Sequence, residues 1–294
     1  MDPVGRANAP GRAIAFMLFG TAILTVNDSI LKWLSAAYPT GQIMCLRGLF
    51  VILPVAILVW RSGGLAVLRV QNFRRHALRA ACVVAGAFFF ITGLRYMPLA
   101  DAIAITFAGP LFLTALAQPF LGEAVGWRRW TAVLIGFVGV LMMVRPTGGA
   151  VQWVALLPLA GSLFGAFRDL ITRKISTDES SIALLCTSTA GVVLAGFCTL
   201  PFGWKPVPAV DLGLLMASGI LVGSAHFLLI ECFRLAEAAL VAPFKYSNMV
   251  WAILFGFVVW GDVPDPWTFT GAAIVVASGI YILHCEAQLR AGGV

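Results

Sequence analysis

The feature of this chain that most constrains its fold is a long series of apolar runs separated by short polar segments. A helix needs about 20 apolar residues to cross the hydrocarbon core of a bilayer. Ten runs approach or reach that length, so the 294 residues leave no loop long enough to fold as a separate soluble domain. We expect an all-α polytopic membrane protein with ten transmembrane helices, at about 13–34, 42–60, 78–95, 100–121, 129–144, 153–172, 181–200, 211–232, 239–260 and 267–285.

The composition excludes several other classes of protein. Hydrophobic residues make up 60% of the chain and charged residues 11%, compared with roughly 45–50% and about 25% in soluble proteins. A soluble enzyme, a disordered chain and a secreted disulfide scaffold are therefore excluded. The six cysteines form no CxxC pair and lie in or beside apolar runs, so we expect reduced thiols that pack as small apolar groups. His76, His226 and His284 are too far apart to indicate a metal site, and we expect no metal and no cofactor.

Lysine and arginine are distributed unevenly between the two sides of the expected bundle. If the N-terminus is cytoplasmic, the outer loops hold only Arg95, Arg145 and Lys205. Basic residues concentrate in cytoplasmic loops, so we predict cytoplasmic N- and C-termini and a bacterial-type inner membrane. The same rule explains the net charge of +7, and we expect no nucleic-acid partner. The inner segments hold thirteen basic residues: Arg6, Arg12, Arg61, Arg69, Arg74, Arg75, Arg79, Arg128, Arg129, Arg173, Lys174, Arg234 and Arg290.

The two halves of the chain come into register when the sequence is shifted by about 140 residues. Asp28 then meets Asp169, and Trp127 meets Trp267. Each half would hold five helices, an odd number, so the second half must enter the membrane from the opposite side. We predict inverted repeats at 1–148 and 149–294, a plan of secondary transporters whose substrate site lies between the repeats. Further matches are Gly20 with Gly161, Lys32 with Arg173, Arg95 with Arg234, Gly122-Glu123 with Gly261-Asp262, and Gly139 with Gly279.

Short motifs recur at the ends of both halves. Leu121-Gly122-Glu123 and Trp260-Gly261-Asp262 each precede a glycine-containing helix, and residues 27–32 read Asn-Asp-Ser-Ile-Leu-Lys, with Arg47 following. In these motifs the chain resembles the EamA-type drug/metabolite transporter family over nearly its whole length. The resemblance implies a basket of helices around a central cavity, with the fifth and tenth helices peripheral. It implies export of small metabolites, foremost amino acids, with riboflavin or S-adenosylmethionine carriers as alternatives.

Polar side chains inside the apolar runs are the candidates for contact with a substrate. An ionisable group within the membrane is costly unless it faces a cavity or a partner. Arg47 could bind a carboxylate through two parallel hydrogen bonds, or could instead pair with Asp28 or reach the outer interface. The polar stretch Pro243–Asn248 and the equivalent helix around Pro110 are expected to form the cavity wall; the alternative is a kinked helix with its polar groups satisfied internally. The candidates are Asn27, Asp28, Arg47, Thr106, Phe107, His226, Lys245, Tyr246, Asn248 and Trp251.

A second set of charged residues could gate the cavity or couple transport to protons. Asp28 and Lys32 are four residues apart and share one helix face, as Asp169 and Arg173 do. One interpretation is that each pair closes one mouth of the cavity in turn. The other is that each is a fixed intrahelical ion pair. The gate or coupling candidates are Asp28, Lys32, Arg168, Asp169 and Glu231, with His226 as a further proton acceptor.

The sequence lacks the motifs of the common enzyme classes. GxxxxGK[ST], HExxH and GxSxG are all absent, so we expect a carrier that is not an enzyme and does not itself hydrolyse ATP. Asp262 and Asp265 form a DxxD motif, as in some membrane prenyltransferases, which leaves such an enzyme as one alternative. A scaffold that transports nothing is another. The expected partners are a small-molecule substrate and the lipid bilayer, and we expect a monomer.

Overall fold

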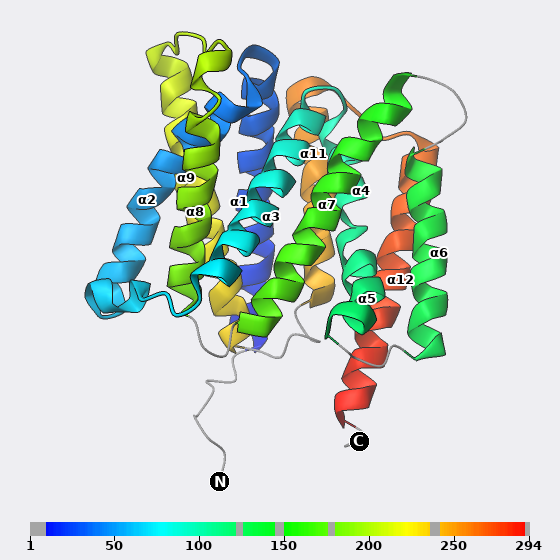
Figure 1. Cartoon of the computed structure of the whole chain (residues 1–294). Coiled ribbons are helices and arrows are strands. Elements are labelled where there is room, and N and C mark those ends of the chain that lie inside the picture. The colour runs from blue at the N-terminus through cyan, green and yellow to red at the C-terminus, as the bar shows by residue number, and fades with distance from the viewer. Residues whose placement is uncertain (1–9, 122–125, 145–149, 176–179, 236–241, 292–294) are drawn as a thin grey trace.

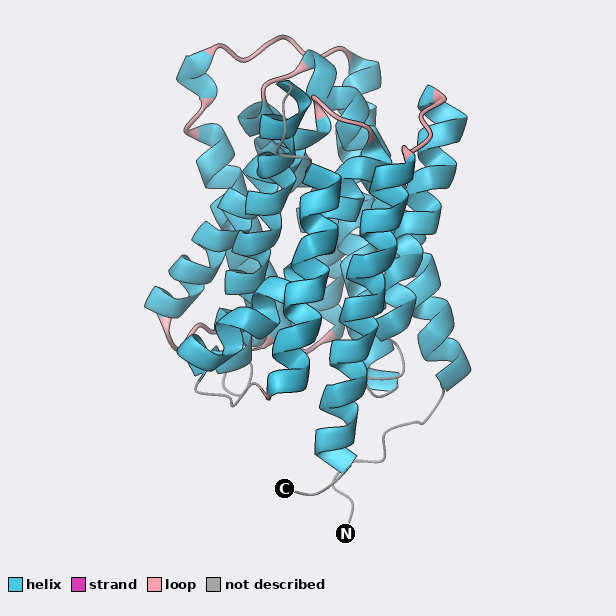
Figure 2. Cartoon of the chain, turned by 90° about the vertical axis from the view of Figure 1, so that its right-hand side faces the viewer, coloured by secondary structure: helices cyan, strands magenta, loops and turns pink. Residues whose placement is uncertain are grey.

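The computed structural model describes residues 10–121, 126–144, 150–175, 180–235 and 242–291, which form a bundle of helices without a strand (Figure 1). The first described helix begins and the last one ends at the same end of the bundle (Figure 2), here named the terminal end. The opposite end, where α1 leads into α2, is named the α1–α2 end. The helices are α1 (Pro10–Ala37), α2 (Thr40–Arg61), α3 (Phe73–Leu94), α4 (Leu99–Thr106), α5 (Gly109–Leu121), α6 (Trp127–Val144), α7 (Ala150–Ile175), α8 (Ser181–Phe197), α9 (Ala209–Leu235), α11 (Ser247–Trp260) and α12 (Pro266–Ala291), with short 3-10 helices η1 (Gly64–Leu68), η2 (Leu200–Phe202) and η3 (Ala242–Tyr246).

The chain is an all-helical polytopic membrane protein. Within the described residues, eight helical stretches are long and apolar enough to cross a bilayer. The runs predicted at 181–200 and 239–260 form shorter apolar helices, Ile182–Phe197 and Phe244–Trp260. The count of ten transmembrane helices therefore stays a prediction, as do the repeat boundaries, because residues 145–149 lie outside the described part of the chain.

Two of the predicted helices are not continuous. The run at 100–121 is divided into α4 and α5 at Phe107 and Ala108, whose backbone N–H groups bond to Ala104 and Ile105, three residues back. The cause is Pro110, which has no N–H and whose ring would clash with the carbonyl of residue 106 in a regular helix. In the run at 239–260, η3 precedes α11 and ends at Tyr246. Both interruptions fall in the two runs that are expected to form the cavity wall.

Glycine lets two helices from opposite halves of the chain touch backbone to backbone. A Cβ atom on Gly139 of α6 would lie 2.7 Å from the Gly271 carbonyl oxygen of α12, and one on Gly271 would lie 2.6 Å from the Gly139 oxygen. Such contacts between small residues stabilise helix packing in membranes, where apolar area alone supplies little driving force. Accordingly, α6 and α12 lie together at one edge of the bundle (Figure 1), as the peripheral placement of the fifth and tenth helices implied.

The α1–α2 end is filled by the main apolar core and tied by polar contacts. Lys32 of α1 donates to Asp262, after α11, over 2.9 Å, and Gln42 of α2 donates to the Lys205 carbonyl over 2.6 Å. The Tyr38 hydroxyl bonds to Asp211 of α9, and this hydrogen bond raises the pKa of Tyr38. These contacts join segments far apart in sequence at one end of the bundle. Fully buried side chains there include Leu31, Leu34, Ile43, Met44, Ile91, Leu94, Leu99 and Ile103.

Candidate functional site

Charged side chains from six elements gather inside the bundle, between the buried α1–α2 end and the terminal end. The charges of Arg47 and Asp28 act on each other across α2 and α1. The His226 ring of α9 experiences the charges of Arg168, Arg47 and Arg79, which come from α7, α2 and α3. These residues, named here the charged cluster, are Asp28, Arg47, Arg79, Arg168, Asp169, His226 and Lys245.

Hydrogen bonds of Asn27 hold Asp28 of the charged cluster and join α1 to α9. The Asn27 amide donates to Asp28 Oδ1 over 2.9 Å, and the Asn27 carbonyl oxygen accepts from Ser218 over 2.6 Å. Asn27 is buried, while Asp28 is partly exposed beside Arg47. The Arg47 Nε atom is buried and finds no hydrogen-bond partner among the described residues. Asp28 is thus held by a neutral amide, and Arg47 keeps a donor for another group.

On α7, Arg168 holds Asp169 of the charged cluster in a similar way. Arg168 Nη2 lies 2.8 Å from Asp169 Oδ1, and Arg168 Nε donates to the same oxygen over 2.8 Å. The side chains are 38% and 43% exposed although other helices surround them, so they face a space within the bundle. At a shift of 141 residues, Arg168-Asp169 is equivalent to Asn27-Asp28, and in each pair the first residue donates to the second.

Arg79 is a member of the charged cluster that sequence reasoning missed. The composition around it places Arg79 among the cytoplasmic basic residues, but α3 begins at Phe73, so Arg79 lies inside the helix. Its Nε donates to Thr172 of α7 over 2.8 Å, and Nη1 donates to the Leu184 carbonyl over 2.8 Å and to Ser188. The one feature of the sequence that indicates a position inside the helix is that Arg79 lies at the edge of the apolar run at 78–95.

His226 and Lys245 present polar atoms to the interior space. His226 Nδ1 lies 2.7 Å from the Val222 carbonyl, which can only accept, so Nδ1 carries a hydrogen and Nε2 is the atom open to protonation. Both side chains are exposed, yet the charges of Asp169 and Arg168 act on Lys245 from α7. Both side chains are therefore accessible to a solute or water, although charges on other helices act on them. The predicted coupling residue Glu231 lies in α9, but its side chain is outside what the structure describes.

The two helix interruptions meet at an aromatic contact. The rings of Phe107 and Tyr246 pack edge to face, with centroids 5.1 Å apart and planes inclined at 78°. Asn248 accepts from Thr25 of α1 over 2.6 Å. The predicted wall residues therefore adjoin α1, although the Thr106 hydroxyl bonds within its own helix, to Ile103 at 2.7 Å.

Trp251 lies farther along α11. Its Nε1 atom is buried and lacks a hydrogen-bond partner among the described residues. An unpaired buried N–H group is costly, which keeps Trp251 among the residues that could donate to a bound molecule.

The predicted pairing of Asp28 with Lys32 is not the one found. Lys32 bonds to Asp262 and lies 4.6 Å from the centre of the Trp260 ring, one turn closer to the α1–α2 end than Asp28. The reason is local: Asn27 bonds to the Asp28 carboxylate, and Gly261, with φ of 71°, ends α11 so that Asp262 reaches α1. Asp169 likewise bonds to its neighbour Arg168. The Arg173 side chain lies outside the described residues.

The DxxD motif has a structural use in this protein. Asp262 bonds to Lys32, and Asp265 Oδ1 accepts from the backbone N–H groups of Trp267 and Thr268, each over 2.9 Å, at the start of α12. These are ion-pair and N-cap contacts. Among the described residues, no three His, Cys, Asp or Glu side chains are grouped as metal ligands would be.

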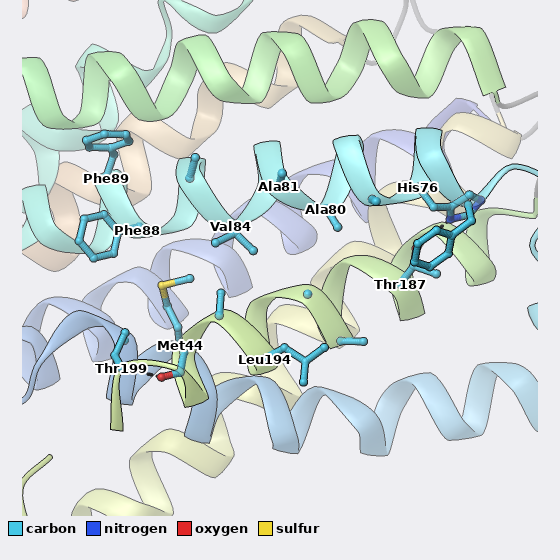
Figure 3. A pocket seen from close by; sticks show the side chains of 18 residues that line it. Met44, His76, Ala80, Ala81, Val84, Phe88, Phe89, Thr187, Leu194 and Thr199 are labelled. Carbon is cyan, nitrogen blue, oxygen red and sulfur yellow. Dashed lines mark hydrogen bonds between the residues drawn. The ribbon is translucent and has the colours of Figure 1, made fainter. Parts of the chain in front are cut away.

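An apolar groove of about 760 Å³ lies between α3 and α8 (Figure 3), and none of its lining residues belongs to the charged cluster. His76 and Thr187 mark one end, and Met44, Phe88 and Thr199 the other. Its walls are almost wholly apolar, so it offers no counterpart for a charged solute.

Comparisons with known proteins agree on a transporter family. Residues 11–145 match the EamA-like transporter family. A riboflavin transporter of Rhizobium johnstonii is 28% identical over 97% of this chain and 96% of its own length. An S-adenosylmethionine uptake transporter of Rickettsia bellii is 26% identical over 93% and 94%. A pseudopaline exporter of Pseudomonas aeruginosa is 26% identical over 87% and 90%. One solved crystal structure shares the fold with a TM-score of 0.66 at 18% identity, covering 95% of this chain and 99% of that one.

Proposed function

We propose that this chain is an EamA-type drug/metabolite transporter that carries small metabolites with an acidic group, foremost amino acids, out of the cell by alternating access. The observation that supports the proposal is the charged cluster in the bundle interior. Among the described side chains of this cluster, Arg47, Arg79, Arg168 and Lys245 outnumber the carboxylates Asp28 and Asp169. Unbalanced charge inside a membrane is costly unless a partner or water neutralises it, and a carboxylate of the substrate supplies such a partner.

The residues have complementary tasks in this proposal. Arg47 and Lys245 bind the carboxylate, because the Arg47 Nε donor is unpaired and Lys245 is exposed within the bundle. Asp28, with Asn27 holding it in place, faces the ammonium group of an amino acid. Arg168 and Asp169 provide the equivalent pair in the second half. Proton coupling, if transport requires it, uses Asp28, Asp169, Glu231 or the Nε2 atom of His226.

Alternating access follows from the architecture we propose, two inverted five-helix repeats at 1–148 and 149–294. Three features support it: the matched Asn27-Asp28 and Arg168-Asp169 pairs, the helix interruptions at Phe107 and Tyr246, and the reciprocal packing of α1 on α9 and α3 on α7. With both termini cytoplasmic, as the basic residues favour, the polar contacts of the α1–α2 end lie on the outer side of the charged cluster.

Riboflavin transport is the second candidate, favoured by the aromatic pair. Phe107 and Tyr246 lie where both interruptions meet, and aromatic rings there offer an apolar surface for a flavin. The relative from Rhizobium johnstonii is named for this vitamin. S-adenosylmethionine is less favoured, because its sulfonium cation would enter a site with an excess of cationic side chains.

The test is efflux from proteoliposomes that contain the purified chain. The vesicles are loaded with amino acids, riboflavin and S-adenosylmethionine together, and mass spectrometry reports which solutes leave faster than from protein-free vesicles. Selective loss of amino acids, abolished by Arg47→Gln, supports the first proposal. Loss of riboflavin alone supports the second. Absence of flux for every solute, with and without an imposed pH difference, contradicts both.

A further inference from the structure

The groove between α3 and α8 has the shape of a site for an extended apolar molecule. Sixteen residue steps separate Phe73 from Phe89 along its α3 wall, which corresponds to ~24 Å at 1.5 Å per residue. The hydrocarbon core of a bilayer is about 30 Å thick, so the groove follows most of that depth. Small side chains form much of its floor: Ala77, Ala80, Ala81, Ala85, Ala190 and Gly191.

The groove exists because α8 packs closely on α2 instead of filling the space beside α3. A Cβ atom on Gly196 of α8 would lie 2.6 Å from both Cys45 N and the Gly41 carbonyl oxygen of α2. On the α3 side, Gly191 approaches Ala80, with 3.0 Å from its ideal Cβ to the Ala80 Cβ. A groove with an alanine-rich floor at the lipid-facing surface accepts a flexible chain without displacing any bulky side chain.

At the terminal end of the bundle, His76 and Thr187 give the groove a polar end, and two arginines lie next to it in sequence. His76 is buried there, with Nδ1 2.9 Å from the Thr187 hydroxyl, which links the two walls (Figure 3). Arg74 and Arg75 follow Phe73 in the first turn of α3, and both side chains are exposed. Basic side chains beside grooves between transmembrane helices attract anionic lipid headgroups.

We propose that this groove binds an anionic phospholipid, with an acyl chain along α3 and α8 and the headgroup held by Arg74 and Arg75. The apolar walls would bind the acyl chain, and the two guanidinium groups would favour a negatively charged headgroup. Of the charged cluster, Arg79 lies on α3 and bonds to Leu184 and Ser188 of α8, but none of the seven cluster residues lines the groove.

Photoreactive lipids test the proposal on the full-length protein in nanodiscs. Phosphatidylglycerol and phosphatidylcholine carry the same diazirine-bearing acyl chain, and the labelled peptides are identified by mass spectrometry. We expect phosphatidylglycerol to label residues 73–89 and 187–199 roughly 30-fold more than phosphatidylcholine, from the contribution of two basic residues near the membrane surface. The variant Arg74→Gln/Arg75→Gln should lose this preference. Arg128→Gln/Arg129→Gln, in the first turn of α6, should keep it.

A second pair of variants tests the binding of the acyl chain without changing the charge of the protein. Ala81→Trp fills the groove from an exposed position on α3 and should abolish labelling of both walls. Leu134→Trp, at a lipid-facing position that is 61% exposed on α6, should leave it intact. Three results would overturn the proposal: equal labelling by the two lipids, labelling unaffected by Ala81→Trp, or cross-links from the groove to a second copy of the chain.

Discussion

The ion pair between Lys32 and Asp262 should determine how often the α1–α2 end is closed. The two side chains are only 14% and 33% exposed and lie 2.9 Å apart. A hydrogen bond to a charged group contributes about 1.5–3 kcal/mol when buried, and partial exposure reduces this. We take the stabilisation lost in the Asp262→Asn variant as about 2 kcal/mol. If the pair forms only in the closed arrangement, this change alters the ratio of closed to open molecules by ~30-fold.

The assay is reaction of a buried cysteine with a membrane-impermeant maleimide. Ser35→Cys in a background without the native cysteines places the thiol on α1 near Lys32, where the residue is 1% exposed. Asp262→Asn should accelerate labelling from outside by about ten- to thirtyfold, and the exchanged pair Lys32→Asp/Asp262→Lys should restore slow labelling. Asp265→Asn is the control, since Asp265 caps α12 within the same turn. Labelling of the Asp262→Asn variant as slow as that of the parent would refute the reasoning.

Three further predictions concern the interior. Arg47→Gln should reduce substrate flux at least tenfold with normal membrane expression, measured by efflux from proteoliposomes; flux within twofold of the parent would remove Arg47 from the substrate site. Asp28→Asn should also lower flux, and an unchanged rate and pH profile would exclude it from coupling. Gly279→Ala should destabilise the protein by about 1–3 kcal/mol in detergent melts, since its Cβ would lie 1.8 Å from the Tyr246 hydroxyl. Gly213→Ala, with no atom within 4 Å, should be neutral or stabilising.

The sequence predicts the fold well because apolar periodicity and length are local properties. The runs of apolar residues coincide with helices, and Pro110 explains the interruption at Phe107, which the length of the run at 100–121 does not predict. The start of α3 at Phe73 was harder to place, because the arginines of its first turn resemble a loop in composition. Composition therefore places Arg79 in a loop, whereas it lies inside α3.

Contacts within the site depended on packing that the sequence does not display. Spacing of four residues made Asp28 and Lys32 natural partners, yet Asp262, 230 residues away, bonds to Lys32. Helix spacing says which side chains share a face but not which neighbouring helix supplies a competing group. The Phe107 and Tyr246 candidates, chosen from equivalent polar runs, do lie together, because both runs break at the same depth in the bundle.

The contact of Gly139 with Gly271 restricts how this protein moves. Where two backbones touch, neither helix has side chains that could reorient to absorb a displacement, so α6 and α12 should stay together through the transport cycle. The two halves of the chain are then held together along the edge formed by α6 and α12. Access can change only by rotating the remaining helices about that edge, and the largest displacements should fall on α2, α8 and α9, which lie at the opposite side of the bundle in Figure 1.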